Sequence, residues 1–148
     1  MNITIKQLTS GDTVKFIEML RLFEDVFEMK DFQMPGEDYL TALLRRKDFL
    51  VFEAVLENEI VGGLTAHILP SYYFGSSEVY IYDLAVKTSF QRKGIGKKLL
   101  CALTEYCRRK GYKEVFVQAD EPDIHALEFY RSTGGRAKKV VHFYYPIK

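Results

Sequence analysis

The chain has 148 residues, of which 47% are hydrophobic and 28% are charged, and its formal net charge at pH 7 is +1. This length suits one compact domain, expected to span residues 1–148, and a charge so near zero argues against nucleic acid as the main partner. No window is long and apolar enough to cross a bilayer, and the amino terminus has no signal-peptide core, so we expect a cytoplasmic protein without a membrane partner.

In chain order, the first half of the sequence predicts a strand, two helices and two further strands. Residues 2–8 alternate apolar and polar side chains, as a strand beside solvent does. Apolar residues recur every three to four positions over residues 14–29, and a second stripe of this kind begins after Pro35. Residues 49–69 predict two antiparallel strands joined by a polar turn at residues 57–59.

The second half predicts three more strands and two more helices. Strands are expected at residues 79–86, 114–119 and 137–147, and a short helix at residues 124–132. A longer helix begins near Gly94 and ends with three cationic residues and a glycine, as the helix dipole favours. The predicted fold class is therefore α/β (α+β), with a mixed, mainly antiparallel sheet flanked by about four helices in the order β-α-α-β-β-β-α-β-α-β.

The cysteines and histidines do not predict a metal site. Cys101 and Cys107 lie six residues apart on one predicted helix and match no zinc or thioredoxin spacing, so both are expected to be packing residues in a reducing compartment. His67, His125 and His142 share no ligand spacing, and we predict no metal. The aromatic runs at 72–74 and 143–145 favour core or interface packing, which leaves a homodimer open.

The stretch QRKGIGKKLL, residues 91–100, joins the strand that ends at Val86 to the following helix. The first amides of a helix have no internal partner, so glycines at this point can let phosphate oxygens approach the backbone. Four cationic residues add positive charge: Arg92, Lys93, Lys97 and Lys98. The alternative is that the glycines only relieve crowding while the cations form a solvated face.

Two common phosphate-binding motifs do not fit this stretch. A Walker loop would need glycine at Gln91 and a serine or threonine at Lys98. A dinucleotide fingerprint would need a third glycine at Leu99. The remaining pattern resembles the Q/R-x-x-G-x-G/A signature of the GNAT superfamily of N-acetyltransferases, with matches at Gln91, Gly94 and Gly96.

The resemblance covers nearly the whole chain, because the predicted element order is also that of the family. Within the family the sequence is most similar to the aminoglycoside 3-N-acetyltransferases. Four stretches in register carry this likeness: PGEDYLTALLRRKDF, IYDLAV, VQAD and VHF. The resemblance implies that acetyl-coenzyme A is the acetyl donor and that a small cationic amine is the acceptor.

The resemblance also implies which residues contact the coenzyme. Residues 83–86 would offer strand-edge backbone groups to the pantetheine arm, whose amides can pair as an added strand does. The implied coenzyme contacts are Leu84, Ala85, Val86, Gln91, Arg92, Lys93, Gly94, Ile95, Gly96, Lys97, Ala126 and Tyr130. Relatives often carry asparagine where this chain has Asp123, which puts that coenzyme contact in doubt.

The candidate acid and base residues are Asp83, Glu78 and Tyr130. Asp83 lies within an apolar strand, where an ionised carboxylate is costly unless it is paired, so it is either a structural residue held by amides or a cation, or the general base. Glu78 is the second candidate base, at the position that many relatives use. Tyr130 matches the tyrosine that protonates the departing thiolate in relatives, although a core aromatic residue would explain it equally well.

The acceptor site is expected to be acidic. Residues 24–38 carry six acidic side chains against one lysine, and a second acidic group follows the strand at residues 114–119. The candidate acceptor-binding residues are Tyr82, Asp83, Asp120, Glu121 and Asp123. Acidic groups near one cleft would concentrate polycations, although ordinary solvated faces are the usual explanation for such charges.

The sequence therefore predicts an acetyl-coenzyme A-dependent N-acetyltransferase that acetylates the 3-amino group of aminoglycosides by direct attack on the thioester. No protein nucleophile is evident. One alternative is a polyamine, peptide or other small-amine acetyltransferase. A second alternative is a non-enzymatic coenzyme A-binding sensor.

Overall fold

The computed structural model describes residues 1–148 and divides into two compact units, residues 1–117 and 118–148. The first unit contains the sheet and three α-helices, and the second contains one α-helix and the C-terminal segment. No helix is long and apolar enough to span a membrane.

A five-stranded sheet in the order β1-β2-β3-β4-β5 forms the centre of the first unit. All neighbouring strands are antiparallel except β4 and β5, which are parallel. The sheet is therefore mixed and mainly antiparallel, as the sequence predicts. Its strands are β1 (Thr4–Gln7), β2 (Phe49–Leu56), β3 (Glu59–Ser71), β4 (Ser76–Val86) and β5 (Glu114–Val117).

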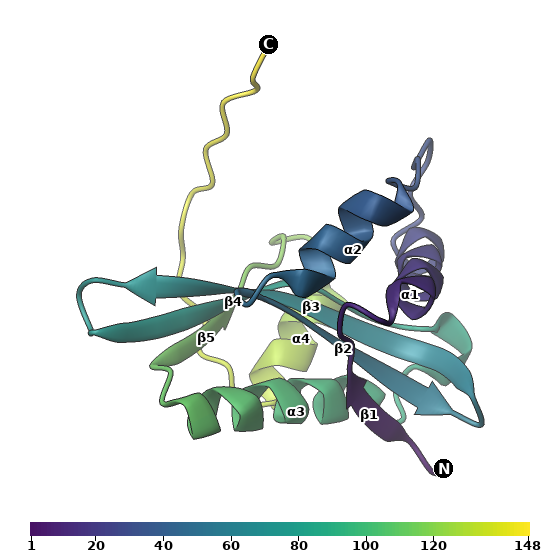
Figure 1. Cartoon of the computed structure of the whole chain (residues 1–148). Helices are drawn as coiled ribbons and strands as arrows, with labels where there is room; N and C mark the ends of the chain where they lie inside the picture. Colours follow the sequence, from purple (N-terminus) through teal and green to yellow (C-terminus); the bar gives the residue numbers. More distant parts are fainter. The chain divides into compact units, whose positions relative to one another are not determined.

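Helices cover both faces of this sheet (Figure 1), with α1 and α2 on one face and α3 on the other. A short 3₁₀ helix, η1, lies between β4 and α3, and α4 belongs to the second unit. The four α-helices agree with the predicted number. Their bounds are α1 (Thr13–Val26), α2 (Glu37–Arg45), α3 (Ile95–Lys110) and α4 (Ile124–Ser132), and η1 is Thr88–Phe90.

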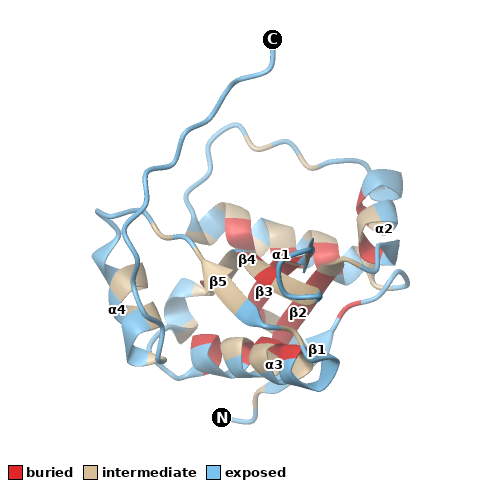
Figure 2. Ribbon diagram, turned by 90° about the vertical axis from the view of Figure 1, so that its left-hand side faces the viewer, coloured by how far each residue is buried: buried red, intermediate tan, exposed pale blue.

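Two apolar clusters form the core, one on each face of the sheet. One packs α3 against alternate residues of β2, β3 and β4, including Phe52, Leu64 and Ile81. The other packs α1 and α2 against the opposite face, including Val51 and Ala85. The buried residues lie on the inner sides of these helices and along the middle strands (Figure 2). Alternate residues of each strand point to opposite faces, and helices cover both faces, so the strands are apolar along much of their length.

Two adjacent glycines let helices approach the sheet closely. A Cβ atom at Gly63 would lie 2.5 Å from the Met19 sulfur of α1, and one at Gly62 would lie 3.3 Å from Leu99 of α3. The contact at Gly63 is shorter than real Cβ contacts, so a larger residue there would require the buried Met19 side chain to shift.

The hairpin between β2 and β3 has a two-residue loop. Glu57 and Asn58 both adopt positive φ, 49° and 67°, as a type I′ turn requires. The polar turn predicted at residues 57–59 is confirmed, with Glu59 already in β3.

A β-bulge interrupts the pairing of β3 with β4. Thr65 is opposite Asp83, whereas the next residue, Ala66, is opposite Ile81, so Tyr82 is the additional residue. Ile81 belongs to the core cluster beneath α3, but Asp83 lies on the same face as Ala85, towards α1 and α2. The bulge therefore turns Asp83 to the opposite face from Ile81.

Two predictions about the chain are wrong. No strand forms at residues 137–147, which are exposed throughout, because apolar alternation favours an extended chain but a strand also needs a hydrogen-bonded neighbour. Cys107 is a buried packing residue, but Cys101 is exposed. Six residues of helix rotate the second side chain far from the direction of the first, so only one of the two can face the sheet.

Candidate active site

The turn between β4 and α3 has the backbone geometry of an anion site. Gly94 is the residue before the first turn of α3 and has a φ of 81°, and Arg92 has a φ of 61°. No side chain caps this helix, so its first amides, at Ile95, Gly96 and Lys97, keep the positive end of the dipole free. A Cβ at Gly94 would meet nothing within 4 Å, so its positive φ, rather than crowding, is the reason for glycine.

The cationic side chains of this turn are available to a ligand. Arg92, Lys93, Lys97 and Lys98 are exposed, and none of them forms a salt bridge. Lys93 only lies over the ring of Phe90, with its ammonium 5.8 Å from the ring centre. An open backbone, a free helix N-terminus and unpaired cations together fit the phosphate groups of coenzyme A.

Gln91 holds this turn against the strand. Its side-chain amide donates a 2.9 Å hydrogen bond to the Val86 carbonyl at the end of β4. The sequence predicts a coenzyme contact for Gln91. The structure shows that its amide also links the last residue of β4 to the turn.

The predicted pantetheine-binding segment lies where β4 extends beyond its neighbour. β5 pairs with β4 only from Glu78 to Ile81, and the pairing ends with Ile81 opposite Val117. No strand therefore pairs with residues 82–86 on this edge. Strand-edge amides and carbonyls of this kind can bind an extended amide chain.

Asp83 lies half-buried on β4 without a hydrogen-bond or salt-bridge partner. Burial raises the pKa of its carboxyl from 3.8 to about 6. The structural alternative, a carboxylate held by amides or by a buried cation, finds no such partner. A carboxyl with a pKa of about 6 is mostly ionised at neutral pH, so it can accept a proton from a substrate ammonium group.

Glu78 lies on the same strand but far from Asp83. The two residues are five positions apart in the sequence, or roughly 15 Å at the rise of a β-strand. Glu78 is opposite Leu69 of β3 and Glu114 of β5. Because of this separation, the two carboxylates are alternative bases and do not act as a pair on one atom.

Aromatic rings line the sheet next to Asp83. Tyr82 is 62% exposed, and its ring centre lies 5.5 Å from that of His67 and 6.2 Å from that of Tyr80. Tyr80 stacks on Phe116 of β5 at 5.0 Å. Tyr82 is a predicted acceptor-binding residue, but its aromatic neighbours were not predicted. The alternation of Tyr80 and Tyr82 beside the strand containing Phe116 was the available signal.

The remaining predicted site residues belong to the second unit. Tyr130 is half-buried on α4, and its ring centre lies 5.1 Å from that of Phe129. Asp123 precedes α4 and accepts a 3.1 Å hydrogen bond from the amide of Ala126. Asp123, predicted to bind the acceptor, thus also caps a helix. Asp120 and Glu121 are exposed in the turn before it.

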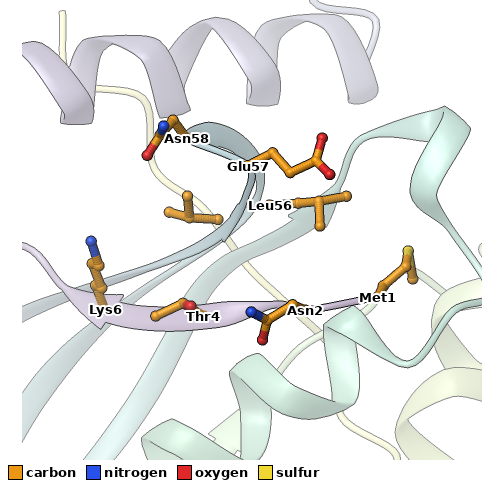
Figure 3. A pocket seen from close by; sticks show the side chains of 8 residues that line it. Met1, Asn2, Thr4, Lys6, Leu56, Glu57 and Asn58 are labelled. Atoms are coloured by element: carbon orange, nitrogen blue, oxygen red, sulfur yellow. The ribbon is translucent and has the colours of Figure 1, made fainter.

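The first unit has a surface hollow of about 480 Å³. Figure 3 shows its lining side chains, which come from the start of the chain with β1 and from the end of β2 with the turn after it. None of them is a predicted site residue. The structure contains no cluster of three or more histidine, cysteine or carboxylate side chains that could hold a metal.

Comparison with known proteins gives strong matches to acetyltransferases. The model of the acetyltransferase (GNAT) family matches residues 16–134. An aminoglycoside acetyltransferase from an uncultured soil metagenomic sample, solved in complex with trehalose and with sisomicin, is 52% identical, with a TM-score of 0.97 over 99% of this chain and 97% of that one. A second such enzyme, also from an uncultured soil metagenomic sample, is 34% identical, with a TM-score of 0.93 over 100% of both chains.

Curated proteins match over a shorter region. Glucosamine 6-phosphate N-acetyltransferase of Trypanosoma brucei brucei is 35% identical over 79 residues, which are 53% of this chain and 52% of that protein. An uncharacterized N-acetyltransferase of Bacillus subtilis (strain 168) is 31% identical over 67 residues, 45% of this chain and 43% of that protein. The chain thus spans about half the length of these curated relatives.

A mixed sheet whose fourth strand leads through an open, cationic turn into an uncapped helix fits an enzyme that uses a phosphate-bearing substrate. The chain belongs to the acetyltransferase (GNAT) family. It is an N-acetyltransferase by family, and acetyl-coenzyme A is the acetyl donor of that family. The turn at residues 91–97 fits this donor for the reasons of backbone and charge given above.

Proposed function

We propose that this N-acetyltransferase acetylates aminoglycosides, and specifically their 3-amino group. The observation that carries the proposal is the 52% identity, over 99% of the chain, to an aminoglycoside acetyltransferase solved with sisomicin. The 3-amino position rests on the sequence likeness to aminoglycoside 3-N-acetyltransferases.

The charge of the first unit supports a polycationic acceptor. The segment from Glu24 to Asp38 has six acidic side chains, and only Glu24 is paired, with Arg21 at 2.9 Å. The other five remain exposed. Exposed and unpaired carboxylates attract a cation over about a Debye length, roughly 8 Å at physiological salt.

In the proposed mechanism, Asp83 is the general base. Its carboxylate takes a proton from the substrate ammonium, directly or through one water, and the neutral amine attacks the thioester carbon. Acetyl-coenzyme A supplies the acetyl group as this thioester. Tyr130 donates its phenolic proton to the thiolate that leaves, and the second proton, which the nitrogen loses as the amide forms, returns to the Tyr130 oxygen through solvent. The chain forms no covalent bond with the acetyl group.

The other predicted residues bind and orient the two substrates. Residues 84–86 offer backbone groups to the pantetheine arm, the turn at residues 91–97 binds the phosphates, and Ala126 and Tyr130 are proposed to contact the coenzyme as well. Tyr82, Asp120, Glu121 and Asp123 contact the acceptor. Two copies of the chain are proposed to form a homodimer.

The test is the product of a reaction with gentamicin and acetyl-coenzyme A. We expect mass spectrometry to show one added acetyl group and NMR to place it on the 3-amine. Spermidine, glucosamine 6-phosphate and a peptide amine are the competing acceptors, each followed by release of coenzyme A. Turnover of one of these with no acetylated aminoglycoside at high enzyme concentration would refute the proposed acceptor. Coenzyme binding without turnover on any amine would favour the sensor.

A second measurement tests the proposed base. Asp83→Asn should lower kcat by about a hundredfold or more and leave coenzyme affinity nearly unchanged. Glu78→Gln is the matched control, since it removes the other candidate carboxylate from the same strand. A larger loss in Glu78→Gln than in Asp83→Asn would move the base to Glu78.

A further inference from the structure

Two buried polar atoms in the sheet have no hydrogen-bond partner. They are Oε2 of Glu53, in a residue 1% exposed, and Oγ1 of Thr65, in a residue 4% exposed. Burying a polar group without a partner is costly, so such groups are rare in native proteins. One of these atoms is an acceptor, and the other belongs to a hydroxyl that can donate.

Strand register places both side chains in one row with Asp83. Glu53 of β2 is opposite Gly63 of β3, and Thr65 lies two residues further along β3 on the same face. Glu53 and Thr65 are thus diagonal neighbours, within reach of a long side chain. Thr65 is directly opposite Asp83 of β4. The row Glu53, Thr65, Asp83 therefore crosses three strands.

Glu53 and Thr65 are shielded from bulk solvent, and the Glu53 end of the row lies beside the half-exposed Lys15. Met19 of α1 is fully buried and lies over Gly63, beside Glu53 and Thr65. At the outer end, Lys15 of α1 is half exposed, and its ammonium lies 3.9 Å from Oε1 of Glu53.

The other charged groups near Glu53 are Lys6, which is opposite it on β1, and Asp12 and Glu18. Burial raises the pKa of Glu53, against the effects of Lys15 and Lys6, so its carboxylate accepts a proton more readily than an exposed one.

We propose that Thr65 and Glu53 are positioning residues that form a proton exit path from Asp83 to solvent. The proposal rests on the proposed role of Asp83 as the general base. Asp83 gains a proton from the substrate amine and passes it to the Thr65 oxygen, while the Thr65 hydroxyl proton moves to Oε2 of Glu53, directly or through one water. Glu53 then releases the proton to water beside Lys15. Every proton taken from an amine is thereby returned to solvent.

The first test measures the titration of Asp83 itself and needs no turnover. The probe is carbon-13 NMR of labelled aspartate carboxyls, with the Asp83 signal assigned by its loss in Asp83→Asn. Glu53→Gln should lower the pKa of Asp83 by half a pH unit or more, because it removes a negative charge and gives Thr65 a donor. Glu18→Gln removes a nearby exposed charge and is the matched control, with no comparable shift.

A double-mutant cycle separates coupling through the Thr65 hydroxyl from an electrostatic effect of Glu53 on Asp83 through space. In Thr65→Val, which keeps the side-chain shape, the effect of Glu53→Gln on Asp83 should fall to less than half, whereas Thr65→Ser should keep it. Thr65→Ala replaces Thr65→Val if that variant does not fold. The proposal is overturned if Glu53→Gln leaves the pKa of Asp83 unchanged. It is also overturned if Glu53→Gln shifts this pKa equally with and without the Thr65 hydroxyl.

The second test is kinetic. Thr65→Val should lower kcat severalfold with little change in the KM of the acceptor, and Thr65→Ser should restore most of it. A wild-type kcat in folded Thr65→Val would overturn the exit path even if gentamicin is acetylated. Absence of turnover in the parent would refute the proposed function instead, and the NMR cycle would still decide whether the three side chains are coupled.

Discussion

Replacement of Asp83 by asparagine should stabilise the protein at neutral pH while it removes the proposed base. The reason is the burial of the carboxyl, which raises its pKa from 3.8 to about 6 without a partner to offset the cost. Asparagine has nearly the same shape and carries no charge to bury. The wild-type chain should therefore be less stable than Asp83→Asn wherever Asp83 is ionised.

The magnitude and its pH window follow from proton linkage. Below about pH 4 the carboxyl is protonated in both the folded and unfolded states, and burial has no electrostatic cost. Between pH 4 and pH 6 the folded state keeps a proton that the unfolded state has lost, so the free energy of unfolding falls as the pH rises. Above pH 6 the cost is constant. The shift of about two pH units corresponds to at most about 3 kcal/mol.

Urea unfolding of the two proteins at pH values from 4 to 8 measures this difference. The stability gain of Asp83→Asn should be absent near pH 4, grow to pH 6 and then level off. Asp48→Asn is the control with the opposite sign, because hydrogen bonds from Arg46 lower the pKa of the Asp48 carboxyl. Its loss of stability should be present at neutral pH and vanish in acid. A gain in Asp83→Asn that does not change with pH would refute the burial argument.

Three further outcomes are expected. Acetyl-coenzyme A should raise the melting temperature of the protein. Gly96→Val should weaken that effect, because a branched side chain would stand in the first turn of α3, where the phosphates are expected. A folded Gly96→Val variant that binds the coenzyme with the affinity of the parent would contradict this. The KM for gentamicin should rise with ionic strength, because salt screens the attraction between exposed charges. This increase should be smaller in Asp120→Asn, and steady-state kinetics measures both. A maleimide reagent should modify exposed Cys101 quickly and Cys107 slowly, by mass spectrometry, because burial raises the pKa of the Cys107 thiol to about 11.

The features that the sequence predicts well are local ones. Glycines and cations follow an apolar strand at residues 91–98, and this pattern alone predicts the open, cationic turn at a helix start that the structure has. Asp83 is conspicuous because it interrupts an apolar run. Both signals depend on neighbours within about ten residues, so no long-range pairing has to be known.

Features that depend on pairing between distant segments were not predictable. The row formed by Glu53, Thr65 and Asp83 exists only because three strands meet in one register. The strand expected at residues 137–147 is a second example. Its alternation of apolar and polar residues is clear, but the sequence around it does not show which strand it would pair with. Local pattern sets the tendency of a segment to extend, and the tertiary contacts decide whether it pairs.

The bulge at Tyr82 connects the fold to the proposed chemistry. In a regular strand, Asp83 would point to the same face as Ile81, into the apolar cluster beneath α3. A carboxylate there would be buried among aliphatic side chains. One additional residue instead turns Asp83 towards Thr65 and leaves Tyr82 exposed beside it. The bulge thus gives β4 both an apolar side that holds α3 and a polar position suited to a general base.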